Sequence, residues 1–243
     1  GQARLVLGER FQRRNAAGQW EALDEAANAA LRAQLATDPR LAILPADQQD
    51  EKQLQAFRER IAAAKAQHLG QAPEPLCLVR VPGESTNRSG GIPGCESANR
   101  LARGSDAAQV VAAAYLAADA RADFALQNAG GVRTPIPAGD LSMNTLFGVL
   151  PFDNTLVELE LTGAEIHAML EEAVANWRDA QRSDGAHPYA AGLRWQLDLS
   201  RPAGQRFSAL QIHNRHSGAW QAVDPTQRYV MITSDYVASG KDG

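Results

Sequence analysis

Apolar and polar positions alternate along the first part of the chain and then give way to a helical pattern. Residues 1 to about 22 alternate apolar with polar side chains, which is typical of paired strands, and the polar segment 15–18 supplies a turn between them. An alanine-rich segment from Asp24 to Ala36 follows and favours a helix. The pattern therefore predicts a β-hairpin and then a helix.

A long, mostly polar helix is predicted from about residue 46 to Gly70. Its apolar residues recur at helical spacing and form one narrow stripe for packing: Leu54, Phe57, Ile61 and Ala64. Gly70 ends the pattern, and the proline-rich segment "GQAPEPL" begins there. We therefore expect this helix to be a linker between two domains.

From residue 75 the pattern changes to alternating strands and helices. Strands are predicted at 76–81, 123–127, 156–162, 193–199, 207–213 and 229–237. A helix is predicted at residues 105–119 with Ser105 as its cap, and another after Thr162, which is placed to form a capping box with Glu165. This order of elements indicates an α/β domain without internal repeats.

The composition is that of an ordinary globular protein with a mildly acidic charge. Hydrophobic residues make up 44% and charged residues 21% of the 243 residues, and the formal net charge is -4. This charge argues against general binding of nucleic acid, which usually needs a basic face. We expect no membrane span, because no apolar run approaches the roughly 20 residues that one requires. The first residues lack the layout of a signal peptide, and the abrupt end at 241–243 suggests a fragment.

Two cysteines, Cys77 and Cys95, flank a loop rich in glycine, proline and serine. Two thiols are too few for a structural zinc site, which has four close ligands. Two interpretations remain open: unrelated free thiols, or a disulfide that stabilises the fold by about 3 kcal/mol and implies an oxidising compartment. The five histidines are scattered, and neither a Gly-x-Ser-x-Gly elbow nor a P-loop occurs. The sequence therefore predicts no metal site and no catalytic residue in this chain.

One segment of the second part has a chemistry that suits an anion. Asn128, Gly130, Gly131 and Arg133 come directly after the strand predicted at 123–127. Bare backbone amides beside a guanidinium can hold a phosphate. The alternative is a tight turn with an exposed arginine, since glycine pairs commonly mark turns.

Three further residues could complete a binding site. Phe152 follows Pro151 at a strand start, Tyr236 follows the last strand, and Asp242 lies in a glycine-flanked turn. Taken singly, each has a plain explanation, as a core residue, a half-buried aromatic and a turn residue. Together with the arginine they supply two flat rings for a base, a carboxylate for vicinal hydroxyls and a cation for phosphate. Those are the parts that a nucleotide requires.

Three segments in this order, "NAGGVR", "LPFDNTLVELELTG" and "TSDYVASGKDG", resemble the C-terminal domain of the 5′-nucleotidase family. The resemblance implies a layered mixed-sheet α/β (α+β) fold for the substrate-binding domain at 75–243, and an inter-domain linker helix at 46–74. Residues 1–45 are similar to the tail of the family's metallophosphoesterase domain. In the family that domain holds two divalent metal ions, such as zinc or manganese, which activate a water. Its Asp, His and Asn metal motifs have no counterpart in this sequence.

The resemblance implies a role for each candidate residue. Arg133 would bind the phosphate, and Asn128 would touch the base or orient the loop that contains Gly130 and Gly131. Phe152 and Tyr236 would hold the purine between their rings, each stacked face contributing about 1–3 kcal/mol. Asp242 would accept hydrogen bonds from the ribose hydroxyls.

The chain also departs from the family's usual pattern. Tyr236 stands where the family usually has Phe, and Lys241 stands where glycine is usual. A further phosphate arginine is expected just upstream of the helix at 105–119, where Arg100 and Arg103 are both candidates.

By this resemblance the chain is the nucleotide-binding domain of a periplasmic or secreted 5′-nucleotidase-like hydrolase, inactive without its metal domain. Its expected small-molecule substrate is AMP, NAD or a UDP-sugar. One alternative is a non-catalytic nucleotide-binding module. Another keeps the family but changes the reaction, to that of a cyclic-nucleotide phosphodiesterase and 3′-nucleotidase or of a sulfur-ester hydrolase. Metal motifs upstream of this chain would favour an enzyme over a module.

Overall fold

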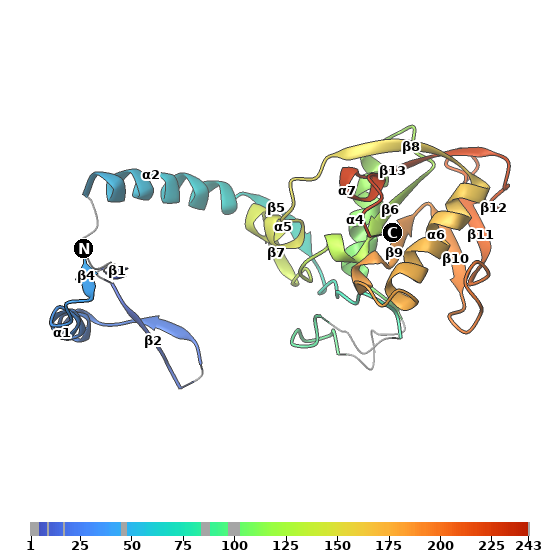
Figure 1. The fold of residues 1–243 in the computed structure, drawn as a ribbon. Helices are drawn as coiled ribbons and strands as arrows, with labels where there is room; N and C mark the ends of the chain where they lie inside the picture. The colour runs from blue at the N-terminus through green and yellow to red at the C-terminus, as the bar shows by residue number, and fades with distance from the viewer. Residues whose placement is uncertain are drawn as a thin grey trace. The chain divides into compact units, whose positions relative to one another are not determined.

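The computed structural model describes residues 5–8, 10–16, 18–44, 48–83, 88–96 and 103–242. The chain divides into two compact units, residues 1–64 and residues 65–243 (Figure 1). Among the helices in the described residues, none is both long enough and apolar enough to cross a bilayer.

The first unit consists of short strands and two helices. In chain order these are β1 (Leu5–Leu7), β2 (Gln12–Arg14), β3 (Trp20–Ala22), α1 (Glu25–Leu35), β4 (Leu41–Ile43) and α2 (Gln48–Lys65). β2 and β3 pair antiparallel, and Gly18 takes a φ of +77° in their turn, so the predicted hairpin is confirmed. The predicted alanine-rich helix is α1, with Asp24 as its N-cap. β1 pairs in parallel with β4, which the sequence pattern did not predict.

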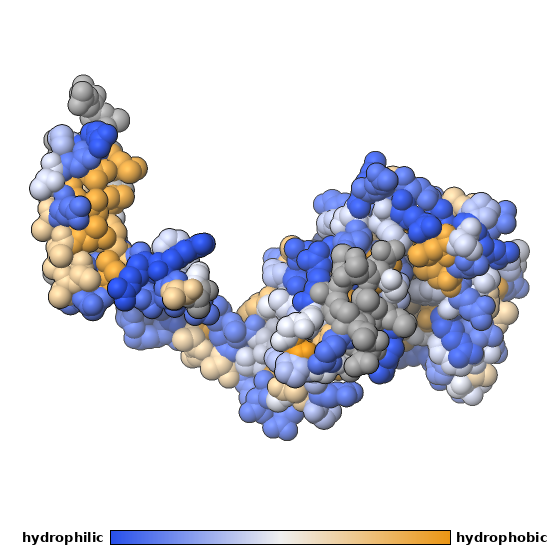
Figure 2. Space-filling model, turned by 90° about the horizontal axis from the view of Figure 1, so that it is seen from below, coloured by the Kyte–Doolittle hydropathy of each residue, from blue (hydrophilic) through white to orange (hydrophobic). Residues whose placement is uncertain are grey.

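Apolar side chains remain exposed on the first unit, and Figure 2 shows this apolar surface. Leu5, Trp20 and Leu44 are 64%, 63% and 56% exposed. The α2 stripe that was predicted to pack is exposed at Leu54, Phe57 and Ile61 as well. Of the side chains described in this unit, none that is apolar is buried. The unit therefore has little core of its own.

The linker helix is shorter than predicted. α2 ends at Lys65, and the residues that follow form β5 (His68–Ala72). β5 pairs antiparallel with β7 (Gly139–Ser142), a strand of the second unit. The expectation of a helix to residue 74 is wrong because the backbone of β5 bonds to a partner distant in the sequence, which local periodicity does not reveal.

The second unit is built around a mixed four-stranded sheet with the strand order β8-β13-β6-β9. These strands are β8 (Leu156–Thr162), β13 (Arg228–Ser234), β6 (Phe124–Asn128) and β9 (Pro188–Ala191). β6 and β13 run parallel, and the other two pairs are antiparallel. A second, antiparallel sheet contains β10 (Leu193–Leu197), β11 (Phe207–His213) and β12 (Trp220–Ala222).

Helices pack on both faces of the main sheet, so the unit is layered (Figure 1). Phe124 of β6 belongs to the core cluster formed with α6 (Gly163–Arg178), which also includes residues of β11. The next residue, Ala125, belongs to the cluster that packs against Tyr115 of α4 (Asp106–Ala118). Successive side chains of a strand point to opposite faces, so one buried strand serves both layers. The layered mixed-sheet α/β fold is confirmed.

Two helices of this unit, α4 and α6, start where the sequence predicts. The side chain of Ser105 accepts a hydrogen bond from the N–H of Ala108 at 3.0 Å and caps α4. Thr162 and Glu165 form the predicted capping box at the start of α6. Both caps satisfy backbone N–H groups that have no partner within the helix.

Most strand predictions for this unit are confirmed within a few residues, but two need correction. The apolar run at 76–81 is not a regular strand, although Leu76 forms a bridge to Ile136. It is apolar because it is a buried extended segment, with Leu78 and Val79 fully buried. The last strand ends at Ser234, which caps α7 (Asp235–Ala238). The short elements α5 (Met143–Val149), β7, β9 and β12 were not predicted.

Cys77 and Cys95 form a disulfide, the second of the two interpretations left open by the sequence. Both cysteines are fully buried. On the same loop the backbone N–H of Leu78 donates to Oγ of Ser89 at 3.0 Å. The disulfide and this hydrogen bond together hold the buried extended segment against its loop.

We expect loss of this disulfide to lower the free energy of unfolding by about 3 kcal/mol, since it closes a loop with a sequence separation of 18 residues. The test compares urea unfolding of the parent chain and the Cys77→Ser, Cys95→Ser double variant, each with and without reductant. Reductant should destabilise the parent and leave the variant unchanged. Rapid alkylation of both thiols in the folded, unreduced parent would contradict the prediction.

Candidate functional site

A pocket of about 270 Å³ lies where β6 ends. Its lining combines arginines, short polar side chains, glycines and two aromatic rings: Arg80, Asn128, Gly130, Gly131, Arg133, Phe152, Asn154, Ser183, Tyr236 and Asp242. Among the described residues, the structure thus brings together every site residue predicted from the sequence except Arg103. These residues come from segments far apart in the chain.

The glycine pair at the end of β6 is required by close packing. Neither Gly130 nor Gly131 adopts a positive φ. A Cβ on Gly131 would lie 2.2 Å from Nε2 of Gln127 and 2.8 Å from Oδ1 of Asn128. A Cβ on Gly130 would lie 3.0 Å from Cα of Gly185. Glycines at these two positions therefore let neighbouring amide groups and a second backbone approach the loop.

Arg133 and Phe152 are neighbours on the rim of the pocket. Nη1 of Arg133 donates to the carbonyl oxygen of Gly130 at 3.1 Å, and Cζ lies 5.6 Å from the centroid of the Phe152 ring. A guanidinium at that distance makes a cation–π contact. Phe152 is 52% exposed, so it is not the core residue that one interpretation of the sequence allowed.

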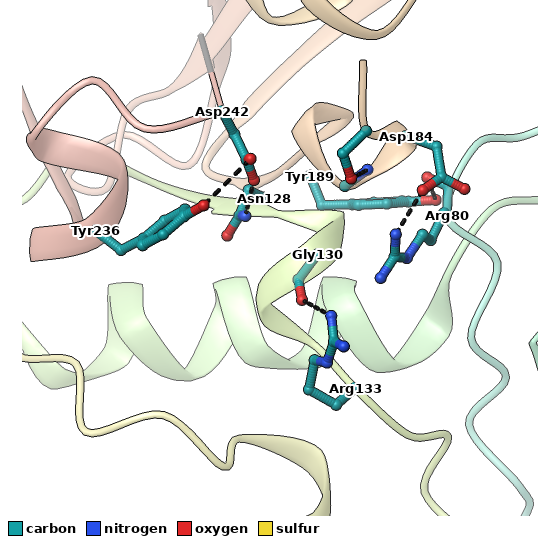
Figure 3. A network of polar contacts seen from close by, with 10 residues as sticks. Arg80, Asn128, Gly130, Arg133, Asp184, Tyr189, Tyr236 and Asp242 are labelled. Atoms are coloured by element: carbon teal, nitrogen blue, oxygen red, sulfur yellow. Dashed lines mark hydrogen bonds and ion pairs between the residues drawn. The ribbon is translucent and has the colours of Figure 1, made fainter. Parts of the chain in front are cut away.

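Asp242 is held by three polar contacts, and Figure 3 labels two of the partners, Tyr236 and Asn128. Its Oδ1 accepts from the hydroxyl of Tyr236 at 3.2 Å, and its Oδ2 accepts from Nδ2 of Asn128 at 2.7 Å. Its backbone oxygen accepts from Nδ2 of Asn176 on α6 at 2.5 Å. The pKa of Tyr236 is raised by desolvation and then by the nearby Asp242 carboxylate. The contacts orient this carboxylate before any ligand arrives.

The amide of Asn128 connects this network to β6. Its Oδ1 accepts from Nε2 of Gln127 at 2.9 Å while its Nδ2 donates to Asp242. Because both ends of the amide are engaged, its orientation is determined by the network. Asn128 therefore links Gln127 of β6 to Asp242.

Arg80 is a pocket residue that the sequence analysis missed. It lies at the end of the buried extended segment, and its Nη1 makes an ion pair with Oδ1 of Asp184 at 2.5 Å (Figure 3). Its side chain is only 7% exposed. The signal in the sequence was a single charged residue within the apolar run "LCLVRV". A pattern that predicts a strand offers no reason to place that charge in a binding pocket.

Of the two upstream arginines, the structure describes one, Arg103. Arg103 is exposed and is not part of the pocket lining. Arg100 lies outside the described residues. Of the two candidates for a further phosphate arginine, the structure thus offers no support for Arg103.

A buried histidine supports the glycine loop. The carbonyl oxygen of His187 accepts from the N–H of Ala129 at 2.9 Å. Its ring packs edge-on against Tyr189, with centroids 5.3 Å apart, and near Trp177, at 6.3 Å. Burial lowers the pKa of His187 from 6.5 to about 4, so the ring is neutral near pH 7.

The chemistry of the pocket is that of binding. It offers guanidinium donors at one end, an oriented carboxylate at the other, and two aromatic rings. In the described part of the chain there is no group of three or more His, Cys, Asp or Glu side chains that could hold a metal ion. The arrangement suits a ligand with an anionic group, hydroxyls and a flat ring.

Comparison with known sequences shows which family the second part of the chain is similar to. The family model of the 5′-nucleotidase C-terminal domain matches residues 81–243. The NAD 5′-nucleotidase of Haemophilus influenzae is 35% identical over 164 residues, which are 67% of this chain and 26% of that protein. Protein UshA of Escherichia coli K12 is 33% identical over 122 residues, 50% of this chain and 20% of that protein. The chain thus spans about a quarter of the first relative's length and a fifth of the second's.

Solved structures agree with the sequence comparison. The NAD nucleotidase of Haemophilus influenzae matches 96% of this chain and 39% of its own, with a TM-score of 0.63 and 26% identity. The 5′-nucleotidase precursor of Thermus thermophilus matches 82% of this chain and 35% of its own, with a TM-score of 0.60 and 29% identity.

The buried neutral His187 should make stability depend on pH. As the pH falls from about 6.5 to about 4, the unfolded chain binds a proton at His187 that the folded chain does not. The free energy of unfolding should therefore decrease over that window, by about 3 kcal/mol for this residue. Urea unfolding at several pH values measures the slope.

His187→Gln should reduce this pH dependence, because glutamine does not titrate. His216→Gln is the matched control, since His216 is exposed and lies in a turn. Equal slopes for the parent and His187→Gln would contradict the assignment.

Proposed function

The chain belongs to the 5′-nucleotidase family and carries its C-terminal domain, and we propose that this domain binds the nucleotide substrate of a phosphohydrolase. The observation that carries the proposal is the convergence of Asn128, Arg133, Phe152, Tyr236 and Asp242 on one pocket. A phosphate, a ribose and a base each have a chemically suitable partner there. The relatives named above include nucleotidases by their own names, which supports the same substrate class.

The phosphate is bound at the glycine loop. Arg133 is exposed on the pocket rim, where it donates to one backbone carbonyl, that of Gly130. A guanidinium can give two parallel hydrogen bonds to phosphate oxygens, a stronger interaction than its contact to a neutral carbonyl. A phosphate can therefore accept hydrogen bonds from Arg133 after only a small change in the conformation of the Arg133 side chain.

The base is bound by the two rings. Phe152 is half exposed although it is large and apolar, and stacking a base on it removes apolar surface from water. Tyr236 carries a cation near its ring, since Nζ of Lys241 lies 5.4 Å from the centroid. Lys241, which stands where the family usually has glycine, therefore lies close to the proposed position of the base. Its ammonium group can leave the Tyr236 ring and contact an electronegative atom of the ligand instead.

The ribose is bound by Asp242. A carboxylate has about four lone-pair positions, and Tyr236 and Asn128 each use one. The remaining positions can accept hydrogen bonds from two vicinal hydroxyls. Because the carboxylate is already oriented, binding the diol costs little further side-chain entropy.

Hydrolysis takes place in a metallophosphoesterase domain outside this chain. Two divalent metal ions there, zinc, manganese or similar, would activate the attacking water, and this domain would position the phosphoester. Residues 1–45 are the tail of that domain in this proposal. Their exposed apolar side chains support it, since exposed apolar patches are expected on a piece of a larger domain.

The substrate is AMP, NAD or a UDP-sugar, and the compartment is the periplasm or the outside of the cell. The buried disulfide supports that location, because such bonds persist in oxidising compartments. Small-molecule binding is also consistent with a net charge of -4, which disfavours nucleic acid as a partner.

Phe152→Ala should weaken binding of adenosine to this chain by about 1–3 kcal/mol, the loss expected for one stacked face. Arg133→Ala should weaken AMP more than adenosine, because it removes a charge-assisted contact that only the phosphate makes. Calorimetric titration of the parent and both variants with adenosine and AMP measures these differences.

Phe147→Ala is the matched control, because Phe147 is 54% exposed on α5 and is not part of the pocket lining. It should leave both affinities unchanged. Unchanged adenosine affinity in a folded Phe152→Ala protein would rule out stacking on this ring. Absence of any adenosine or AMP binding by the parent would overturn the proposed function.

This chain alone should hydrolyse neither AMP, NAD nor UDP-glucose when zinc or manganese is added. The longer protein that includes an upstream metal domain should hydrolyse at least one of them. Release of inorganic phosphate from AMP, of AMP from NAD or of UMP from UDP-glucose measures turnover, and adenosine binding by the same preparation shows that the chain is folded. Metal-dependent turnover by the chain alone would place the chemistry within these residues.

A further inference from the structure

The side-chain oxygen of Gln127 is a buried hydrogen-bond acceptor that the protein does not use. Gln127 belongs to β6 and is only 2% exposed. In the described part of the chain, its Oε1 has no hydrogen-bond partner. Buried polar groups of folded proteins are nearly always paired, so an exception calls for a water, an ion or a ligand.

The direction of the hydrogen bonds at the end of β6 leaves this oxygen unpaired. A carboxylate only accepts hydrogen bonds, so Asn128 must direct its Nδ2 toward Asp242 (Figure 3). Oδ1 of Asn128 then accepts from Nε2 of Gln127 at 2.9 Å, and the backbone oxygen of Asn128 accepts from the same Nε2 at 2.8 Å. Both of these oxygens need a donor, so the nitrogen of the Gln127 amide is assigned to them and Oε1 lies on its other side.

A cavity of about 140 Å³ lies beside Gln127. Besides Gln127, it is lined by Tyr115 of α4 and by two leucines. Gly131, Phe152 and Asn154 line both this cavity and the pocket at the end of β6. The cavity therefore adjoins the pocket, and Gln127 is a buried polar residue in its wall.

The absence of a side chain at Gly131 brings the Gln127 amide to the border between the two. A Cβ on Gly131 would lie 2.2 Å from Nε2 of Gln127, so the amide packs directly against the Gly131 backbone. Phe152, on which the base is proposed to stack, lines the same border. A base on that ring would therefore lie close to the cavity and to the unused acceptor.

We propose that the cavity receives the exocyclic amino group of the base, and that Oε1 of Gln127 accepts a hydrogen bond from this group. The inference rests on the proposed function and narrows its substrate class to adenine nucleotides, such as AMP or NAD, over the UDP-sugars. Adenine carries an amino group on its six-membered ring, whereas uracil carries carbonyl oxygens.

The physical reason for this selectivity is the fixed direction of the Gln127 amide. Oε1 cannot exchange places with Nε2 without bringing an acceptor against the two oxygens of Asn128. A carbonyl oxygen on the base would therefore meet a second acceptor, and neither would be paired. A site built to pair with an N–H group of its ligand discriminates against an analogue that lacks the group.

Calorimetric titration of the chain with adenosine, purine riboside and inosine tests the inference. Purine riboside has the same ring and ribose without the amino group, and inosine has a carbonyl oxygen in its place. The parent should bind adenosine about tenfold more tightly than purine riboside, as expected for one hydrogen bond to a buried group. It should also bind adenosine more tightly than inosine.

Gln127→Met removes the acceptor and keeps a side chain of similar length. It should bring the affinities for adenosine and purine riboside to within about twofold of each other, because neither ligand then gains a hydrogen bond there. Nε2 of Gln127 also holds Asn128, so the variant can weaken all three ligands. The ratio of the two affinities is therefore the readout, since a purely structural role would leave that ratio unchanged.

The matched control is Gln109→Met. Nε2 of Gln109 donates to the backbone oxygen of Ala190 at 2.5 Å, and Gln109 lines neither the pocket nor the cavity. This variant also loses a glutamine hydrogen bond, but it should keep the parental ratio. Thermal melts establish that each variant is folded.

Equal affinities of the parent for adenosine and purine riboside would overturn the inference, as expected if a buried water alone pairs with Oε1. An unchanged ratio in a folded Gln127→Met protein would overturn it as well. If Gln127→Met does not fold, the ratio measured on the parent decides. In each of these cases binding of adenosine to the parent still supports the proposed function, whereas absence of that binding would count against the proposed function itself.

Discussion

Strand β6 ends in a buried position, where each polar group needs a partner from the protein. All five residues of β6 are buried, including Gln127 and Asn128. A buried amide group without a partner costs about 1–3 kcal/mol. The two side chains pair through all of their amide atoms except Oε1 of Gln127, which has no partner in the described part of the chain. They bond to each other, and Asn128 then bonds to Asp242. The demand for a partner at the strand end thus draws the last described residues of the chain into the pocket.

The same constraint explains the glycines and the buried histidine. The amide groups of Gln127 and Asn128 occupy the space that a side chain on Gly131 would need. On the other side the backbone of Ala129 bonds to His187, whose ring is buried and neutral. These contacts hold the loop in its conformation before a ligand arrives. When the geometry of a binding site is preformed, less side-chain conformational entropy is lost on binding.

Local signals predicted the parts of the fold that depend on neighbouring residues. The hairpin at 15–18 and the caps at Ser105 and Thr162 involve groups a few residues apart, and all are present. The run at 76–81 was predicted as a strand, because an apolar run has the same appearance in a strand and in a buried extended segment. β5 was missed because its partner β7 is distant in the chain.

For the candidate site too, local sequence signals predicted one part and contacts between distant segments decided the rest. Asn128, Arg133, Phe152, Tyr236 and Asp242 stand in motifs whose residue types indicate phosphate, base and ribose chemistry, and the chain alone carries that information. Which of them share a pocket, and that Arg80 joins them while Arg103 does not, depends on contacts across the fold. The Asn128–Asp242 hydrogen bond joins residues 114 positions apart, and the Arg80–Asp184 ion pair spans 104. Periodicity and caps act over one or two turns of chain, whereas such contacts arise only when packed layers bring distant segments together.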